Sequence, residues 1–590
     1  MRRRSPRRSP RKGRKAARPA PPPSPGKEEP PRLPILGALL LIGMVLVAYV
    51  PALRAGFVWD DGALTKNPVV QSPGGLWLIW TRPSAYATRE AHYWPLVYTT
   101  FWLEYALWGL RPFGYHLINV LLYALNCVLL WRLLRRVGLP GAWLASAVFA
   151  LHPVHVESVA WVIERKDQLA ALFYLSAFLA YVRFEDSRSP RAYGAAIALF
   201  LCAMLSKSVA VSLPVALGLW LWWKRGRVAE RDLARLAPIL ALGLAIAAAD
   251  AAVASQREPY NSGLSFVERG LLAARAFWFY ASKLAWPANL VTIYPRWEIH
   301  AGSAVAWVYA AAAAAVFALL WAKRKAWGNG PLAAVVYFGV ALGPTLGFVD
   351  HIYMRNSFVA DRFQFLASIG LIALFSALAV SMARDFRSAP RWLPSLAAAA
   401  LLGVLGLLTW RHAEDYKNYE TLFAATLARN PNSWAAHNNL GMALSDQGKY
   451  EEAVQHFDAS IAANPKNEKG HYNKGRAFQL QGRIDEAIAC YRESLRVSPR
   501  YTNALVNLGA ALRKKGQLDE AIQCYRKALQ IDPKDVGAHN NLGVALCNIG
   551  QAAEGLEHFR LALKFQPNHP DALANLKRFE QESQASGPTD

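Results

Sequence analysis

Cysteine is scarce in this sequence, with five residues in 590 and no CxxC pair. An odd number at wide spacing excludes a disulfide framework and gives no zinc-binding pattern. Charge is also low, at 18% of residues, although Lys and Arg (66) outnumber Asp and Glu (41) and leave a net charge of +25. Long hydrophobic runs are missing only after about residue 415, where apolar residues recur every three or four positions among charges. The chain therefore has a membrane part followed by a water-exposed part.

The basic excess begins at the N-terminus. Twelve Lys and Arg residues fall within residues 1–32, a Pro- and Ser-rich tail with too few apolar residues to fold. Such a tail could bind RNA without specificity. Because an apolar segment follows it directly, the pattern favours a cytoplasmic anchor beside anionic lipid. We expect a disordered tail, an uncleaved first span and no specific nucleic-acid partner.

Apolar blocks of about 16–22 residues, long enough to cross the hydrocarbon core as helices, predict about eleven spans. The blocks cover residues 34–53, 114–131, 141–160, 168–184, 192–206, 208–223, 236–254, 303–322, 332–349, 362–383 and 392–411. With the tail inside, every loop predicted to be inside carries at least three cations, as the positive-inside rule requires. Eleven crossings place the C-terminal third outside. Residues 270–290 could add a span, but Arg275 and Lys283 on one helical face favour an interfacial or re-entrant helix.

A 34-residue repeat organises the C-terminal third. Proline recurs at that period, as do two series of glycines: Pro431, Pro465, Pro499, Pro533, Pro567; Gly441, Gly475, Gly509, Gly543; and Gly448, Gly482, Gly516, Gly550. This period and pattern are the signature of tetratricopeptide repeats (TPRs), helical hairpins that bury their apolar faces by stacking. The sequence thus predicts an all-α chain, a polytopic transmembrane helical bundle followed by a TPR α-solenoid. The expected divisions are a tail (1–32), a membrane domain (33–411), a linker with a degenerate half-repeat (412–431), four repeats (432–567) and a capping helix and tail (568–590).

Asparagine recurs in the same register on the first helix of each repeat, at Asn439, Asn473, Asn507 and Asn541. A carboxamide both donates and accepts, so such a ladder could bind the backbone of an extended peptide. The repeats resemble those of O-linked N-acetylglucosamine transferase, in which an asparagine ladder grips acceptor peptides. The alternative is ordinary polar filling of the concave face.

Polar residues of the membrane part gather in the loops predicted to be outside. They include Asp60, Asp61, His152, His155, Glu157, Glu164, Arg165, Lys166, Asp167, Lys207, Asp350, His351, Arg355, Asp361 and Arg362. Because polar groups at a membrane are costly, this clustering predicts a functional site on the outer face.

The segments FVWDD, HYWPLVYTTFWLEYALWGLRPFGYHLINVLL, LHPVHVESVAW, ERKDQLAALFYLSAFLAY, MLSKS and ADRFQFLASIGL closely resemble the transmembrane and TPR repeat-containing proteins. Members of that family are regarded as O-mannosyltransferases of the GT-C superfamily. The resemblance implies that Asp60 and Asp61 match the catalytic acidic pair, and that the donor is a polyprenyl-phosphate monosaccharide. Glu164 replaces the usual Gly before Arg-Ala-Asp, and Lys207-Ser208 replaces Lys-Glu, which leaves the exact donor open.

Transfer from a lipid phosphate needs one carboxylate as base toward the acceptor and cations on the departing phosphate. Asp60 or Asp61 would be the base. The candidate donor-binding residues are Lys207, Arg362, Arg165, His152, His155 and Asp361, with Arg275 as a further cation. Each has a structural alternative: Asp-Asp-Gly is a common turn, Lys207 could snorkel, Asp361-Arg362 could be an ion pair, and the two histidines could cap a helix or bind metal. No metal site is assigned, and a divalent ion is left open.

We therefore expect an inverting GT-C glycosyltransferase that moves mannose from polyprenyl phosphate to Ser or Thr of proteins held by the TPR array. The Ala- and Arg-rich composition suggests a bacterial inner membrane, with the repeats in the periplasm. The alternatives are a non-catalytic scaffold for envelope assembly and a GT-C enzyme with a lipid or polysaccharide acceptor.

Overall fold

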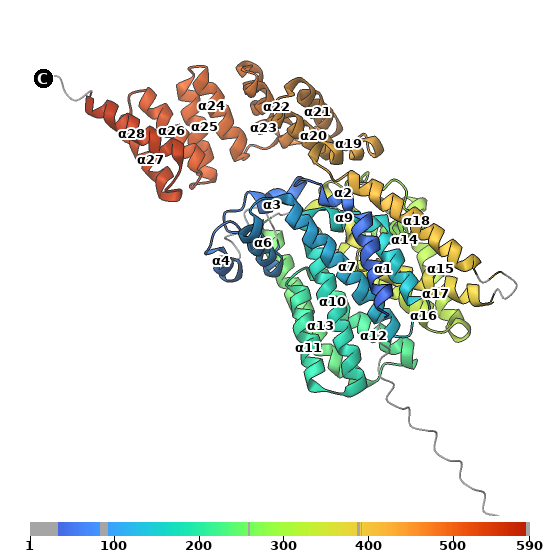
Figure 1. Ribbon diagram of the computed structural model, residues 1–590. Coiled ribbons are helices and arrows are strands. Elements are labelled where there is room, and N and C mark those ends of the chain that lie inside the picture. Colours follow the sequence, from blue (N-terminus) through green and yellow to red (C-terminus); the bar gives the residue numbers. More distant parts are fainter. Residues whose placement is uncertain (1–33, 83–91, 258–259, 386–389, 391, 586–590) are drawn as a thin grey trace, which may run out of the picture.

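The computed structural model describes residues 34–82, 92–257, 260–385, 390 and 392–585, so the predicted basic tail lies outside the described residues. Within those ranges the chain forms helices and no strand, in a bundle followed by a curved array (Figure 1). The all-α fold class, membrane helices followed by TPRs, is confirmed.

The bundle is built from α-helices joined by short 3-10 turns (η). They are α1 (Ile35–Ala48), α2 (Val50–Leu53), η1 (Trp59–Asp61), α3 (Gly62–Thr65), α4 (Gly75–Thr81), α6 (Pro95–Trp108), α7 (Pro112–Arg136), α8 (Ala142–Leu151), η2 (Pro153–His155), α9 (Val156–Ala160), η3 (Val162–Glu164), α10 (Arg165–Ser187), α11 (Pro190–Met204), η4 (Ser208–Ser212), α12 (Leu213–Arg225), α13 (Glu230–Arg257), α14 (Phe266–Ala285), α15 (Ala304–Trp327), α16 (Gly330–Leu342), η5 (Gly343–Thr345), η6 (Ile352–Arg355), η7 (Asp361–Gln364), α17 (Ser368–Asp385) and α18 (Leu393–Glu414).

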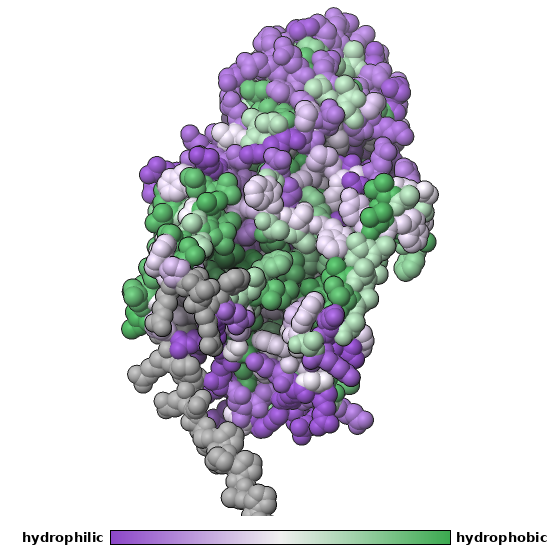
Figure 2. Space-filling model, turned by 90° about the vertical axis from the view of Figure 1, so that its right-hand side faces the viewer, coloured by the Kyte–Doolittle hydropathy of each residue, from purple (hydrophilic) through white to green (hydrophobic). Residues whose placement is uncertain are grey.

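Among the described residues, five helices are long and apolar enough to cross a membrane: Pro112–Arg136, Glu230–Ala254, Ala304–Trp327, Ser368–Asp385 and Leu393–Glu414. Four shorter apolar helices accompany them: Ile35–Ala48, Ala142–Leu151, Pro190–Met204 and Gly330–Thr345. Helix α15 buries none of its residues although it is strongly apolar, as a helix facing lipid would be. Figure 2 shows the corresponding surface, an apolar band between hydrophilic ends. The chain is a membrane protein, and the number of crossings stays a prediction.

One expected span is interrupted. The helix predicted over 141–160 ends at Leu151, because Pro153 has no N–H to donate and holds His152 in an extended conformation. Residues 152–164 then fold back through η2, α9 and η3, and all are buried. The interruption places a polar segment, rather than a continuous apolar helix, at this end of the bundle.

Ion pairs define the opposite end of the bundle. Arg136 binds Asp186 at 2.5 Å, and Arg225 and Arg235 both pair with Glu185. These contacts join the ends of α7, α10 and α12 and the first turns of α13, beside the basic loops predicted to be inside. The TPR array lies at the other end (Figure 1).

The array consists of paired antiparallel helices. They are α20 (Trp434–Asp446) with α21 (Tyr450–Ala463), α22 (Glu468–Leu480) with α23 (Ile484–Val497), α24 (Thr502–Lys514) with α25 (Leu518–Ile531), and α26 (Val536–Asn548) with α27 (Ala552–Phe565), preceded by α19 (Tyr419–Arg429) and followed by α28 (Pro570–Ala585). The first glycine series lies where the paired helices meet: a Cβ on Gly509 would stand 2.6 Å from the Tyr525 ring. The second series ends each first helix with a positive φ, for example +82° at Gly516.

Candidate functional site

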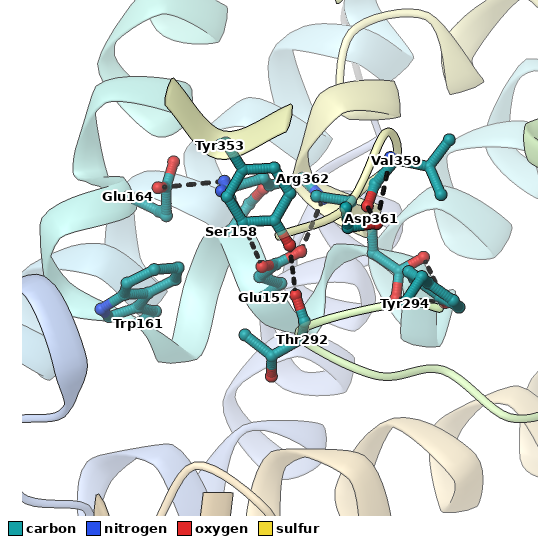
Figure 3. A network of polar contacts seen from close by, with 12 residues as sticks. Glu157, Ser158, Trp161, Glu164, Thr292, Tyr294, Tyr353, Val359, Asp361 and Arg362 are labelled. Carbon is teal, nitrogen blue, oxygen red and sulfur yellow. Dashed lines mark hydrogen bonds and ion pairs between the residues drawn. The ribbon is translucent and has the colours of Figure 1, made fainter. Parts of the chain in front are cut away.

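A buried cluster of charges lies on the folded-back segment between α8 and α10. Arg362, in the short turn η7 that precedes α17, forms an ion pair with Glu157, and its backbone N–H donates to the same carboxylate at 2.9 Å. The Nε of Arg362 lies 3.4 Å from Glu164, and the guanidinium packs over the Tyr353 ring at 4.3 Å (Figure 3). One arginine thus holds together segments that are 205 residues apart in sequence.

Two lysines complete the cation set. Lys166 Nζ lies 3.0 Å from Glu164, and Lys207 Nζ lies 3.6 Å from Glu164 and 2.6 Å from Asp167. Burial alone would raise the pKa of Glu164, but Lys166, Lys207 and Arg362 outweigh it and lower that pKa to about 2. The side chains of Lys166 and Lys207 are 12% and 14% exposed, so this is where the cluster meets solvent.

The two carboxylates of the Asp60–Asp61 pair have opposite environments. Asp61 is 1% exposed and accepts hydrogen bonds from the N–H groups of Val58 (2.8 Å) and Ile163 (2.9 Å). Burial raises the pKa of Asp61 to about 8, although these N–H bonds favour the charged form. Asp60 is exposed. The structure therefore separates the pair into an anchor, Asp61, which ties the first loop to the residue preceding Glu164, and a carboxylate on the surface.

The residue before the pair has an unusual backbone. Trp59 has a φ of +44°, a left-handed conformation that costs a bulky residue about 1–3 kcal/mol and persists only when its surroundings hold it. Its ring stacks on Trp161, with centroids 5.1 Å apart and planes at 12°. Its carbonyl accepts a hydrogen bond from Tyr419 at 2.6 Å.

Asp361 lies next to the cluster but faces the other way. Tyr294 donates to its carboxylate at 2.9 and 3.0 Å, and the side chain is buried (Figure 3). Burial raises the pKa of Asp361 well above its usual range.

Both predicted histidines are tied to protein groups. His152 Nε2 lies 3.0 Å from the carbonyl of Leu284, while His155 Nδ1 lies 2.9 Å from the carbonyl of Phe149 and its Nε2 lies 2.9 Å from Ser368 Oγ. Each side chain is buried. In the part of the chain that the structure describes, no group of three or more His, Cys, Asp or Glu could hold a metal ion.

Arg165 lies apart from the other cations. Its guanidinium is fully buried, forms an ion pair with Glu104, and donates to Asn119 Oδ1 and the Tyr115 carbonyl, each at 2.7 Å. These partners come from α6 and α7, so the contacts of Arg165 join those helices to the start of α10. Arg275 lies elsewhere, over the ring of Trp297 at 4.4 Å.

The asparagine ladder contacts neighbouring repeats. Asn473 donates to Asn438 Oδ1 (2.9 Å) and Asn507 donates to the Tyr472 hydroxyl (2.9 Å). Asn575 of α28 continues the series and donates to Asn540 Oδ1 (3.0 Å), whereas Asn439 donates to the carbonyl of Ala435 in its own helix. Asn541 is partly buried in the same register. The ladder thus helps set how successive first helices pack.

Sequence reasoning noted Glu157, Glu164 and Lys166 as polar outer residues but assigned them no role, and it missed Trp59 and Trp161. The signal was available for Glu164 and Lys166, because a charged run at the head of an apolar helix is costly unless its members are paired. No local signal marks Trp59, whose backbone conformation depends on contacts across the fold.

Comparisons with known proteins agree with this architecture. Residues 92–250 match the family model "Dolichyl-phosphate-mannose-protein mannosyltransferase", and residues 433–550 match TPR models. The chain is therefore a membrane protein in which a region similar to that mannosyltransferase family is followed by TPRs. More narrowly, it is homologous to the transmembrane and TPR repeat-containing (TMTC) O-mannosyltransferases.

Two relatives illustrate the extent of the match. The Caenorhabditis elegans protein O-mannosyl-transferase F38B6.6 is 23% identical over 470 residues, covering 73% of this chain and 63% of the relative. Human protein O-mannosyl-transferase TMTC1 is 26% identical over 496 residues, covering 72% and 54%. The match thus spans little more than half the length of these relatives. Among solved structures, a TPR protein described as "YrrB: a TPR protein with an unusual peptide-binding site" is 21% identical with a TM-score of 0.24, covering 34% of this chain and 97% of that chain.

Proposed function

We propose that this chain transfers mannose from a polyprenyl-phosphate donor to Ser or Thr hydroxyls of proteins at the non-cytoplasmic face of a membrane, the periplasmic face of a bacterial inner membrane. The observation that carries the proposal is the bond from Ile163 to Asp61. It holds the exposed Asp60 loop against the segment that brings Glu164 and three cations together.

The proposed reaction is a single displacement with inversion. Asp60 accepts the proton of the acceptor hydroxyl while the oxygen of that hydroxyl forms a bond to the anomeric carbon of the sugar. The bond from that carbon to the phosphate oxygen breaks, and polyprenyl phosphate departs as an anion. Lys166, Lys207 and Arg362 stabilise the charge on the leaving phosphate. A phosphate needs no acid to leave, which agrees with Glu164 being held ionised.

An apolar cavity of about 300 Å³ supports a lipid-linked donor. It lies between helices α7, α10, α12, α16 and α17, and its lining includes Leu134, Tyr174, Phe178, Trp220, Tyr337 and Leu374. Tyr174 is on the helix that begins just after Glu164, about 15 Å along its axis at the usual rise per residue. A phosphate bound by the lysines would leave its aliphatic chain near this cavity.

The TPR array is proposed to hold the protein acceptor. It lies at the same end of the bundle as the site: Arg355 of the membrane part binds Glu468 of α22 at 3.1 Å, and Asn430 donates to the carbonyl of Ile293 at 3.0 Å. An extended segment on the concave face would therefore be near Asp60 rather than across the membrane from it.

The first prediction tests the base. In proteoliposomes supplied with radiolabelled mannosyl-phosphoryl-polyprenol and a Ser/Thr-rich peptide, Asp60→Asn is expected to lower transfer by about 10²-fold or more, because a general base contributes that much. Asp186→Asn, at the opposite end of the bundle, is the matched control and should transfer normally. Equal transfer by Asp60→Asn and the parent chain would exclude Asp60 as the base. A parent chain that transfers to no acceptor would favour the scaffold alternative.

Glycopeptide mass spectrometry of cells with and without the gene identifies the sugar and the acceptor. Mannosylated Ser or Thr peptides should disappear with the gene. Loss of a glycolipid or polysaccharide instead would contradict the protein acceptor while keeping the transferase.

A further inference from the structure

The start of the TPR part is built into the loop that carries Asp60. The N–H of Gly56 donates to the carbonyl of Lys417 at 2.9 Å, and the Tyr419 hydroxyl donates to the carbonyl of Trp59 at 2.6 Å. These contacts join residues about 360 positions apart in sequence. The repeat part therefore bonds directly to the residue that precedes Asp60.

An aromatic stack continues the contact toward the cations. Phe423 of α19 packs edge-on against Trp59 at 5.6 Å, Trp59 stacks on Trp161 at 5.1 Å, and the Arg362 guanidinium lies 5.3 Å from the Trp161 ring. The Trp161 indole N–H also donates to the carbonyl of Val58 at 3.2 Å. The ring of Trp59 is thus held between the repeat part and the membrane part.

A second set of contacts reaches the same arginine from the linker. The hydroxyls of Tyr416 and Thr292 lie 3.4 Å apart, and Tyr353 donates to the Thr292 carbonyl at 2.5 Å (Figure 3). The Tyr353 ring lies under the Arg362 guanidinium at 4.3 Å. Two independent paths thus connect residues 416–423 with Arg362.

We propose that the linker and helix α19 form one wall of the transferase site, and that Tyr419 is a positioning residue for Asp60. Trp59 has a left-handed backbone that its own side chain disfavours, so neighbours must hold it. Tyr419 and Phe423 hold Trp59 from the repeat side and Trp161 holds it from the membrane side. The backbone of Trp59 sets the direction in which Asp60 projects. This proposal rests on the proposed function, and it gives the first half-repeat a role in the chemical step besides any role in acceptor binding.

The test compares two tyrosine hydroxyls in the full chain. Tyr419→Phe removes the bond to Trp59 but keeps the ring, and Tyr491→Phe removes an internal bond to Gln479 (2.7 Å) within the array. With mannosyl-phosphoryl-polyprenol and a Ser/Thr-rich synthetic peptide, Tyr419→Phe should lower kcat about five- to tenfold with both KM values unchanged, since one neutral hydrogen bond is lost. Tyr491→Phe should keep the parent kcat.

Hydrogen exchange of the peptide spanning residues 54–66 is measured on the same samples and needs no activity. Exchange there should rise in Tyr419→Phe and stay at the parent level in Tyr491→Phe. A Tyr419→Phe variant with parental kcat, or with parental exchange in this peptide, overturns the positioning role. If the parent chain transfers no mannose, the proposed function fails, and unchanged exchange would then overturn the positioning role separately.

Discussion

At the scale of single residues, two adjacent carboxylates differ because one is buried and the other is not. The pKa of Asp61 is raised to about 8 by burial, so the folded protein binds a proton there that the unfolded chain releases near pH 4. Crowding by Asp60 adds to the shift but is not its main cause. At neutral pH the pair therefore behaves as a protonated anchor beside a surface carboxylate.

This difference predicts a pH dependence of stability. Between about pH 4 and pH 8 the folded state holds more protons at Asp61 than the unfolded state, so the Asp61 contribution to stability falls as pH rises through that window and is constant above it. Asp61→Asn should flatten the fall of the melting temperature between pH 5 and pH 8. It should also lower the melting temperature at every pH, because one of two N–H donors loses its acceptor. A variant with the parental slope would contradict the raised pKa.

The two predicted donor-binding cations Arg165 and Lys207 should respond differently to removal. Arg165 is buried among Glu104, Asn119 and Tyr115, so Arg165→Met is expected to destabilise the protein by about 3–5 kcal/mol, the cost of breaking a buried ion pair. Lys207 lies where the cluster meets solvent. Lys207→Met should therefore raise the KM for the lipid-linked donor and should affect stability less than Arg165→Met does. Thermal melting and donor titration separate the two. If both variants only lose stability, Lys207 is structural.

At the scale of elements, the break in the helix at Pro153 determines where Glu157 and Glu164 lie. A continuous helix over 141–160 would carry Glu157 along a membrane-spanning face, where an ionised carboxylate is costly. The fold-back instead brings Glu157 and Glu164 to the end of the bundle, where Arg362 pairs with both. An apparent span in sequence is therefore a short helix followed by a site-forming segment.

The glycines at the repeat contacts predict a stability difference within the array. Gly509→Ala places a Cβ 2.6 Å from the Tyr525 ring, and overpacking of this kind costs about 1–3 kcal/mol. Gly537→Ala, on the first helix of the next pair, meets only Asp535 at 3.4 Å and should change stability by less than about 0.5 kcal/mol. Protease resistance of the C-terminal third of the intact chain on heating measures both. Equal resistance of the two variants would contradict the close helix approach.

At the scale of the whole molecule, the contacts place the TPR array and the charged cluster at one end of the bundle and the basic loops at the other. Single cysteines at Lys66, Arg500 and Arg227, all exposed positions, test this in intact cells. A membrane-impermeant maleimide added outside should label Lys66→Cys and Arg500→Cys and spare Arg227→Cys, relative to the background of the parent chain. Labelling of Arg500→Cys from the cytoplasmic side only would exclude an acceptor site formed with an outward-facing Asp60.

Much of the architecture could be predicted from sequence because its signals are local or periodic. The 34-residue spacing specifies the repeat, and apolar block length marks the segments in which membrane helices form. The candidate residues near Asp60, Lys207 and Arg362 were found because polar groups beside a membrane stand out by composition alone. Their partners could not be found in this way, since Arg362 and Glu157 are 205 residues apart.

The sequence by itself determined the two kinds of solvent that the chain meets, the helical hairpins of its last third and the set of polar residues available near the membrane. Hydrophobic length and repeat period act through neighbouring residues, so they can be read along the chain. Only the tertiary structure decided that Asp61 is buried, that Arg165 pairs with Glu104, and that Tyr419 bonds to Trp59. Burial and hydrogen bonding between distant segments set those roles, and neither is a property of one stretch of sequence.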